Sequence, residues 1–150
     1  MNNMVAQVES LPELIRTQLK EIDSRIRNTF NHNEILSTKK IFITGCGDSY
    51  FAGLAAKLAL KMWTGLSVDV ESSLHAGRYE LPYESQSFPN NPLVIGISVS
   101  GGVSRTIEAI KIANEKGART VALTATPGSE LAKAADKIVD VSVPDFADAP

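Results

Sequence analysis

Residues 40–49 decide the fold of this 150-residue chain, and they read Lys40-Ile41-Phe42-Ile43-Thr44-Gly45-Cys46-Gly47-Asp48-Ser49. The first five residues form a nearly continuous apolar run, which is typical of a strand that is covered on both faces. A short loop of glycine and serine follows, and a helical pattern begins at Ser49. The same order recurs where the run Leu93-Val94-Ile95-Gly96-Ile97 leads through Ser98-Val99-Ser100-Gly101-Gly102 into a helical pattern from Ser104. Each stretch therefore predicts a buried strand that passes through a tight loop into a helix.

From residue 39 onward, runs of β-formers alternate with helical patterns. Strands are predicted at residues 40–44, 66–71, 93–99, 119–124 and 137–143, and helices at residues 49–64, 104–116 and 129–135. Gly65 and Gly117 stand where helix C-caps are expected. Five strands alternating with helices favour a parallel sheet with right-handed crossovers and helices on both faces. The predicted fold class is therefore α/β, an αβα sandwich with the flavodoxin-like strand order 2-1-3-4-5.

An amphipathic helix is predicted ahead of the sheet, at residues 10–30. Ser10 and Glu13 are expected to form a capping box around Pro12, which is tolerated in a first turn. Apolar side chains recur at three- and four-residue spacing, at Ile15, Leu19, Ile22, Ile26 and Phe30. We expect this stripe to pack against its own domain or a partner subunit. The chain is thus divided into an N-terminal helical segment, residues 1–38, and a single domain, residues 39–150.

Composition and charge exclude several classes of protein. The chain has 15 basic and 17 acidic residues and no basic run that would follow a nucleic-acid backbone. Cys46 is the only cysteine, so we expect no intrachain disulfide and no cysteine cluster that would bind a metal. We also expect no metal site of another kind and no cofactor. The apolar runs are too short to span a membrane, and the first residues lack the pattern of a secretory signal. These features predict a cytoplasmic protein that binds neither nucleic acid nor membrane.

The two loops are expected to lie on one crevice. In the order 2-1-3-4-5, the connections that follow strands 1 and 3 leave toward opposite faces, which opens a crevice at the carboxyl ends of those strands. Backbone N–H groups at the loop glycines, Gly45, Gly47, Gly101 and Gly102, together with serine hydroxyls and two helix N-termini, suit an anion such as a phosphate. The serines that would contribute hydroxyls are Ser49, Ser98, Ser100 and Ser104. Taken singly, each loop is also explained as an ordinary turn followed by a serine helix cap.

A dinucleotide-binding loop is the rival interpretation of the first loop. Gly45 and Gly47 fit the start of the pattern G-x-G-x-x-G, and Asp69 or Glu71 stands where an acidic residue would bind the ribose. Tyr50 occupies the third glycine position, however, and this interpretation leaves the second loop unexplained. Neither loop ends in the Gly-Lys-Ser/Thr of a triphosphate-binding loop. A single phosphate group is the favoured ligand.

The two loops resemble the signatures of the SIS (sugar isomerase) domain family. Residues 45–50 are similar to Gly-Cys-Gly-Thr-Ser-Tyr, and residues 98–103 to Ser-Gln-Ser-Gly-Glu-Thr, in the isomerase half of glutamine:fructose-6-phosphate amidotransferases. The resemblance implies that Ser49, Ser98 and Ser100 bind the phosphate of a sugar phosphate. Val99 stands in place of the family's glutamine and Val103 in place of its phosphate-binding threonine. The candidate phosphosugar-binding residues are Gly47, Ser49, Ser98, Val99, Ser100, Gly101 and Ser104.

The resemblance also implies a reaction, the isomerisation or deamination of a hexose 6-phosphate or an aminosugar phosphate. It places the catalytic base, the ring-opening histidine and a lysine in a second SIS domain, so no catalytic residue is assigned here. The helix that usually follows the fifth strand is not expected, because residues 143–150 are rich in helix breakers. We expect an N-terminal half-enzyme completed by a second SIS domain or another copy, with a noncatalytic phosphosugar-sensing module as the alternative. The polar residues after the second strand are expected on an exposed loop, at His75, Arg78, Tyr79, Glu80 and Glu84.

Overall fold

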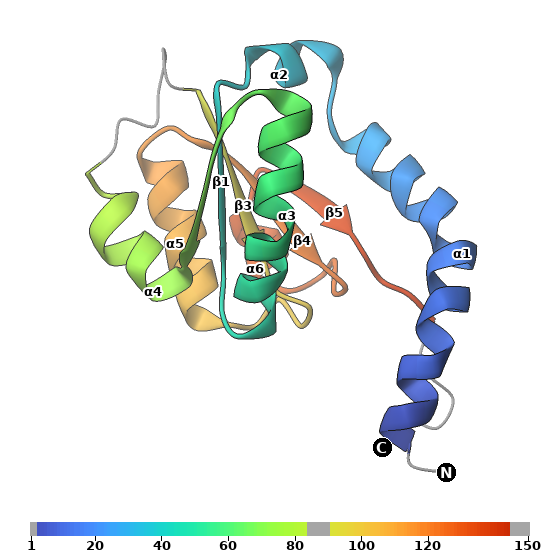
Figure 1. Ribbon diagram of the computed structural model, residues 1–150. Helices are drawn as coiled ribbons and strands as arrows, with labels where there is room; N and C mark the ends of the chain where they lie inside the picture. The colour runs from blue at the N-terminus through green and yellow to red at the C-terminus, as the bar shows by residue number, and fades with distance from the viewer. Residues whose placement is uncertain (1–2, 84–90, 145–150) are drawn as a thin grey trace.

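The computed structural model of the protein describes residues 3–83 and 91–144. Five parallel strands form one sheet in the order β2-β1-β3-β4-β5 (Figure 1). The strands are β1 (Lys40–Gly45), β2 (Ser67–Ser72), β3 (Pro92–Ile97), β4 (Arg119–Thr124) and β5 (Lys137–Asp140). The predicted α/β class and strand order are therefore confirmed. The fifth strand ends at Asp140, three residues earlier than predicted.

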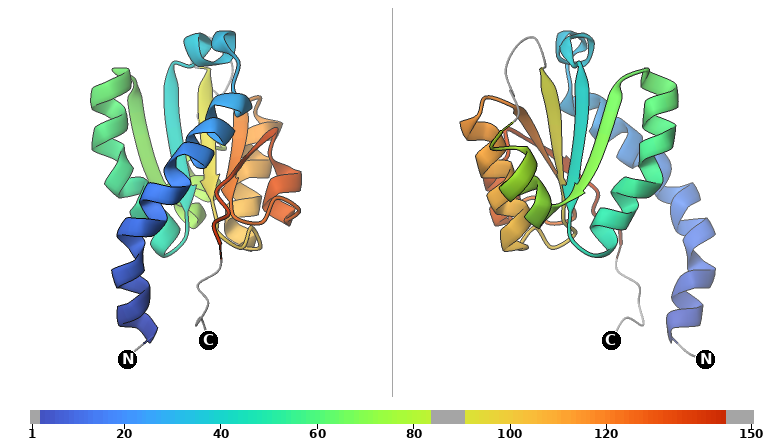
Figure 2. Two further views of the ribbon diagram at one scale, coloured as in Figure 1. Left: turned by 90° about the vertical axis from the view of Figure 1, so that its right-hand side faces the viewer. Right: turned by 60° about the vertical axis from the view of Figure 1, so that its left-hand side comes forward.

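Helices cover both faces of the sheet. On one side lie α1 (Asn3–Thr29), α2 (His32–Ser37) and α3 (Asp48–Thr64), and on the other α4 (Ser73–His75), α5 (Ser104–Glu115) and α6 (Glu130–Ala134) (Figures 1 and 2). Gly65 has a left-handed backbone, with φ of 69°, and ends α3 as predicted. No helix in residues 3–83 or 91–144 is both long and apolar enough to cross a bilayer.

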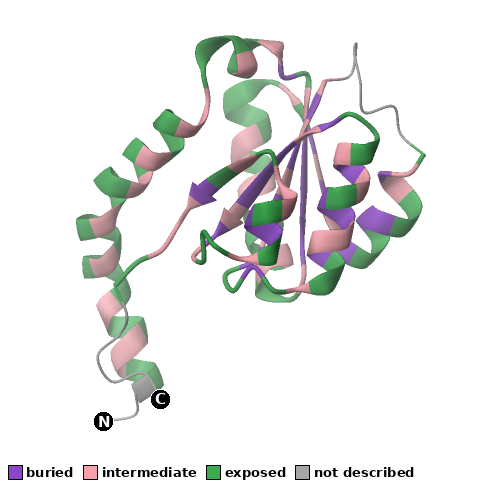
Figure 3. Ribbon diagram, turned by 180° about the vertical axis from the view of Figure 1, so that it is seen from behind, coloured by how far each residue is buried: buried purple, intermediate pink, exposed green. Residues whose placement is uncertain are grey.

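Alternate strand residues face two separate cores. Ile41, Ile43, Val68 and Val70 are buried under α3, as the period-two geometry of a strand requires. The opposite strand faces pack under α5 and α6, around Phe42, Val94, Ala122, Ile110 and Leu131. Glycine allows the closest approach of helix and sheet, because a Cβ at Gly53 would lie 2.9 Å from Ile43 Cγ2. Figure 3 shows that burial is concentrated on the strands and on the helix faces turned toward them.

The N-terminal helix begins earlier than predicted, and its expected capping box is wrong. α1 starts at Asn3, so Ser10 and Pro12 lie inside it, and Ser10 Oγ donates to the Gln7 carbonyl at 2.7 Å. A true capping box occurs instead at α2, where Asn31 Oδ1 accepts from Glu34 N at 2.9 Å and Glu34 Oε2 accepts from Asn31 N at 2.8 Å. In the sheet α1 packs mainly against β5, and much of its apolar stripe is exposed (Figure 3).

The segment after β2 is helical, so the prediction of a loop there is wrong, although His75, Arg78 and Tyr79 are exposed as predicted. α4 continues into the π-helix η1 (Ala76–Glu80), which ends where Leu81 N donates to the Ala76 carbonyl at 2.9 Å. Ala76 and Leu81 are fully buried against α5, and Gly77 lies close to Ala109. The five-residue spacing of the two buried side chains matches the π-helix geometry. Glu84 and residues 145–150 lie outside the described residues, and residues 141–144 are not helical.

Candidate functional site

The structure brings the two glycine and serine loops together, although they lie about fifty positions apart in the chain. We call residues 45–49 the first loop and residues 98–103 the second loop. β1 and β3 are neighbours in the sheet, with Gly45 aligned to Ile97, so the loops leave the same edge side by side. Thr106 Oγ1, in the first turn of α5, donates to Cys46 Sγ at 3.9 Å. Both loops therefore lie at the carboxyl ends of β1 and β3, where the sequence predicts the crevice.

In the first loop the two glycines have different roles. Gly47 precedes α3 with φ of 55° and ψ of −129°, a conformation that favours glycine. Gly45 does not have a positive φ, and a Cβ there would lie 2.9 Å from the Ser49 carbonyl carbon. The loop closes where Ser49 N donates to the Cys46 carbonyl at 3.2 Å and Tyr50 N donates to the Gly47 carbonyl at 3.0 Å. Ser49 is held half-buried at the start of α3.

The second loop is fixed to its surroundings by its own backbone and by Ser98. Ser98 is 3% exposed, and its Oγ accepts from Gly101 N at 3.2 Å, so this hydroxyl shapes the loop. A hydroxyl that accepts still carries its own proton for a second partner. Gly101 has φ of 63°, and its carbonyl accepts from Leu131 N at 3.0 Å. The Val99 carbonyl accepts from Ala125 N at 3.1 Å. The loop is therefore attached to β4 and to α6.

Val99 and Ser100 project outward from this fixed loop. Val99 is 67% exposed, and Ser100 Oγ accepts from Gly102 N at 3.3 Å. Both residues line an open hollow of about 700 Å³, whose other walls are α1, residues 125–126 after β4 and residues 142–144. The α1 residues that line it are Gln7, Ser10, Leu11 and Leu14. Gly47 and Ser49 are not among the described residues that line this hollow. The contribution of α1 was not predicted from the sequence.

Within the described residues, the helices that follow the two loops lack a side-chain cap, as η1 also does, whereas α2, α4 and α6 have one. In the described part of the chain, no side chain caps α3 or α5, whose N-cap residues are Gly47 and Val103. The N-termini of α2, α4 and α6 are capped by the side chains of Asn31, Ser72 and Ser129. Ser49 and Ser104 lie inside the first turns of α3 and α5, so neither serine is the N-cap residue. Ser49 N, Tyr50 N and Thr106 N donate to backbone carbonyls of the preceding turn. The other first-turn N–H groups of α3 and α5 are suited to bind an anion.

Charged side chains beside the crevice pair with one another. His75 Nδ1 lies 3.1 Å from Glu71 Oε2 and its side chain is about half exposed. Glu108 bridges Arg78, at 2.6 Å, and Arg105, at 2.7 Å. The hydrogen bond from Arg105 and the positive charges of both arginines hold the pKa of Glu108 below its ordinary value. Such exposed ion pairs are typical of a solvated surface.

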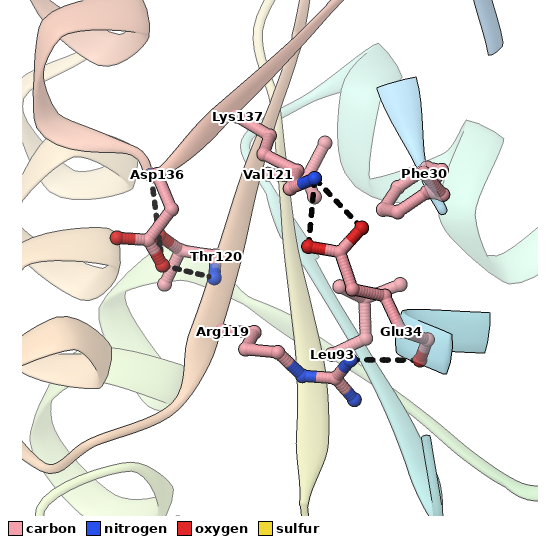
Figure 4. Close-up of a pocket in the computed structure, with 8 residues that line it drawn as sticks. All are labelled: Phe30, Glu34, Leu93, Arg119, Thr120, Val121, Asp136 and Lys137. Carbon is pink, nitrogen blue, oxygen red and sulfur yellow. Dashed lines mark hydrogen bonds and ion pairs between the residues drawn. The ribbon is translucent and has the colours of Figure 1, made fainter. Parts of the chain in front are cut away.

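A second hollow, of about 240 Å³, lies at the opposite, amino-terminal ends of β3, β4 and β5 (Figure 4). The charged side chains that line this hollow form hydrogen bonds with α2 and with neighbouring strands. Arg119 Nη1 donates to the Glu34 carbonyl at 2.7 Å, and Lys137 Nζ donates to Glu34 Oε2 at 2.8 Å. Asp136 Oδ2 accepts from Thr120 N at 2.9 Å. The hydrogen bonds from Lys137 and from Asn31 N lower the pKa of Glu34. These contacts fasten α2 to the sheet and account for the cluster structurally.

Comparison with known proteins gives the family. Residues 34–147 match the family model described as SIS domain. An isomerizing glutamine–fructose-6-phosphate aminotransferase of Mycolicibacterium paratuberculosis is 32% identical over 121 residues, which cover 79% of this chain and 19% of that protein. The enzyme of the same name from Fusobacterium nucleatum is 30% identical over 146 residues, covering 91% and 22%. The chain thus spans about a fifth of the length of these curated relatives.

Solved structures show the same fold. The C-terminal domain of a glucosamine-fructose-6-phosphate aminotransferase from Francisella tularensis has a TM-score of 0.63 at 21% identity, covering 86% of this chain and 39% of that one. The sugar isomerase domain of an RpiR transcription factor from Sphaerobacter thermophilus has a TM-score of 0.68 at 20% identity, covering 93% and 80%. Because the family model covers well over half of the chain, the protein belongs to the SIS domain family.

Proposed function

We propose that this SIS domain binds the phosphate group of a hexose 6-phosphate between its two loops. The observation that carries the proposal is the capping pattern, because α3 and α5 follow the two loops and their N-cap residues supply no side-chain acceptor. A phosphate would accept from N–H groups at both helix starts and interact favourably with both helix dipoles. The proposed binding residues are Gly47, Ser49, Ser98, Val99, Ser100, Gly101 and Ser104.

The energy of such contacts is sufficient without a lysine. A hydrogen bond to a charged group contributes about 1.5–3 kcal/mol, and a helix N-terminus adds about 0.3–1 kcal/mol. A dissociation constant of about 1 mM needs only about 4.1 kcal/mol. A few contacts from Ser49, Ser100 and the first turns of α3 and α5 therefore support millimolar or tighter binding. Val99 contributes no side-chain hydrogen bond, so we expect weaker binding than a glutamine there would allow.

Ligand-induced thermal stabilisation tests this binding. Hexose 6-phosphates should raise the melting temperature, whereas unphosphorylated hexoses and nicotinamide dinucleotides should not. Ser100→Ala should remove most of the shift, and Ser67→Ala, an exposed serine at the start of β2, should leave it unchanged. Equal stabilisation by fructose and by fructose 6-phosphate would show that the phosphate is not what the loops bind.

For the reaction, we propose that the chain is the first SIS domain of a sugar-phosphate or aminosugar-phosphate isomerase. Support comes from the relatives named isomerizing aminotransferases, of which this chain matches about a fifth. Moving a proton between C1 and C2 needs a base, which is proposed to come from a second SIS domain or another copy. In this proposal residues 39–150 form one domain after the helical segment 1–38, and the protein is cytoplasmic.

A partner surface is part of the same proposal. α3 is apolar on its outer face as well as its inner one, with Phe51 63%, Leu58 67% and Met62 72% exposed. A helix that is apolar on all sides is normally buried, so we propose that a second SIS domain, in another copy or another chain, covers this face. Leu58→Glu should lower the molecular mass of any assembly, as measured by analytical ultracentrifugation. Leu74→Glu, on α4 on the other face of the sheet, should leave that mass unchanged. A mass unaffected by both variants excludes α3 as the contact.

A noncatalytic phosphosugar-sensing module is the second candidate. The observation that favours it is that the sugar isomerase domain of an RpiR transcription factor shares this fold, with a TM-score of 0.68 over 93% of this chain. Turnover of fructose 6-phosphate or glucose 6-phosphate by the protein supports the enzyme. Stabilisation by these ligands without turnover favours the sensing module or a half-enzyme awaiting its partner.

A further inference from the structure

A chain of buried hydroxyl groups joins the elements that carry the two loops. Thr44 lies at the end of β1, Ser73 begins α4 and Thr106 lies in the first turn of α5. Thr44 and Thr106 are 0% exposed and Ser73 is 1% exposed. Thr44 Oγ1 donates to Ser73 Oγ at 3.2 Å, and Ser73 Oγ lies 2.9 Å from Thr106 Oγ1. Thr106 Oγ1 in turn donates to Cys46 Sγ, at 3.9 Å, in the first loop.

The direction of the chain follows from counting protons. Each hydroxyl has one proton to donate, and Thr106 donates its proton to Cys46. The geometry between Ser73 and Thr106 admits either donor, and a proton that Thr106 donates to Cys46 leaves Ser73 as the donor. The chain starts in β1 at Thr44, passes through α4 and α5, and returns to the first loop at Cys46, two residues further along. A thiol is a weak acceptor, so the last link is the weakest.

Such a chain is sensitive to the loss of any member. A buried hydroxyl is unfavourable unless it is hydrogen-bonded, and here each hydroxyl satisfies its neighbour. Removing the Thr106 hydroxyl leaves Ser73 with a buried donor that has lost its acceptor, and Cys46 loses its contact with α5. The result is that the position of the first loop depends on a residue 60 positions away, on the helix that follows the second loop.

We propose that Ser73 and Thr106 are positioning residues that set the separation between the first loop and the N-terminus of α5. This inference rests on the proposed function, because that separation determines whether one phosphate reaches both helix starts. Neither residue touches the ligand. Their effect passes through Cys46 and the first turn of α5.

Two substitutions of Thr106 separate its hydroxyl from its methyl group. Thr106→Val keeps the shape and loses the hydroxyl, whereas Thr106→Ser keeps the hydroxyl. With Thr106→Val we expect the amides of Ser49 and Tyr50 to exchange hydrogen at least about threefold faster, and the Kd for glucose 6-phosphate to rise about tenfold. With Thr106→Ser both quantities should stay within about twofold of the original protein. Ser73→Ala should raise the exchange rates and the Kd as Thr106→Val does. It serves as the test variant if Thr106→Val does not fold.

Thr120→Val is the matched control. Thr120 is 1% exposed, and its hydroxyl donates to Asn114 Oδ1 at 2.6 Å at the far end of the sheet. Thr120→Val should lower the stability of the protein. It should leave the hydrogen exchange of the Ser49 amide and the Kd for glucose 6-phosphate unchanged. The proposal is overturned if Thr120→Val or Thr106→Ser moves the first loop as much as Thr106→Val does. If glucose 6-phosphate does not bind the original protein, the proposed function fails, and the exchange rates still decide whether the hydroxyls couple the loops.

Discussion

Replacement of Gly101 with alanine tests the conformation of the second loop. Gly101 has φ of 63°, and a Cβ there would lie 1.9 Å from Ser129 Oγ and 2.3 Å from Ser129 Cβ. The Ser129 hydroxyl can rotate away, but its Cβ cannot, so the loop or the start of α6 has to move. The rotation also removes the cap that Ser129 Oγ provides to Ala132 N at 3.3 Å.

Three contributions set the size of the effect. The left-handed backbone disfavours a residue with a Cβ by roughly 1–2 kcal/mol. Loss of the helix cap costs about 1 kcal/mol, and forcing an extra carbon into a packed site costs about 1–3 kcal/mol. Gly101→Ala should therefore reduce the free energy of unfolding by about 3–6 kcal/mol. At about 2–4 °C per kcal/mol for a chain of this length, the melting temperature should fall by roughly 6–24 °C.

Urea unfolding followed by circular dichroism measures the loss of stability, with alanine substitutions at Gly102 and at Gly47 of the first loop as controls. Gly102 lacks a positive φ, and a Cβ there would have Ser100 Oγ, at 3.8 Å, as its nearest neighbour, so Gly102→Ala should stay within about 0.5 kcal/mol. Gly47 has φ of 55° in open space, so Gly47→Ala should lose only the backbone contribution, about 1–3 kcal/mol. Gly101→Ala and Gly102→Ala with equal stabilities would refute this conformation of the loop.

Three further predictions follow from named contacts. Val103 has the extended backbone of an N-cap, so Val103→Asp should stabilise α5 by about 1 kcal/mol and weaken phosphate binding. Val103→Asn should also stabilise α5, with a smaller loss of phosphate affinity. Urea unfolding measures the stability, and titration calorimetry measures the affinity. Because the pKa of Glu34 is lowered in the folded protein, its ionised carboxylate stabilises the fold above the ordinary glutamate pKa, and this stability is lost as the pH falls below about 4.3. Glu34→Gln should therefore reduce the loss of unfolding free energy at acid pH, measured by urea unfolding at several pH values. An unchanged pH dependence would contradict the pairing with Lys137. Gly53→Ala should cost about 1–3 kcal/mol in thermal unfolding, because its Cβ would lie 2.9 Å from Ile43 Cγ2, and a neutral result would mean that α3 lies further from the sheet.

The centre of the sheet was predictable because strands such as β1 and β4 are buried on both faces. Apolar runs such as residues 40–44 and 93–97 have no helical period, and the glycines that follow them mark where each strand ends. The helix after β2 was not predictable by the same rule, since Ala76 and Leu81 recur five positions apart and match neither the helical nor the strand period. The start of α1 was misplaced because Pro12 and Ser10 suggest a helix beginning, although α1 extends through both residues.

The position of the two loops was predictable from the sequence. Which loop residues hold the loop in place, and which are left to contact a ligand, was not. Ser98 and Gly101 look in the sequence like ligand-binding residues, yet both take part in holding the second loop against its surroundings. That leaves Ser100 and the uncapped start of α5 in a fixed position before any ligand arrives. The missing caps were visible in the sequence, since Gly47 and Val103 precede the two helices, but they had to be recognised as N-caps first. A serine one position later looks like a cap in a sequence, and only the backbone shows that the first-turn N–H groups lack a side-chain cap in the described structure.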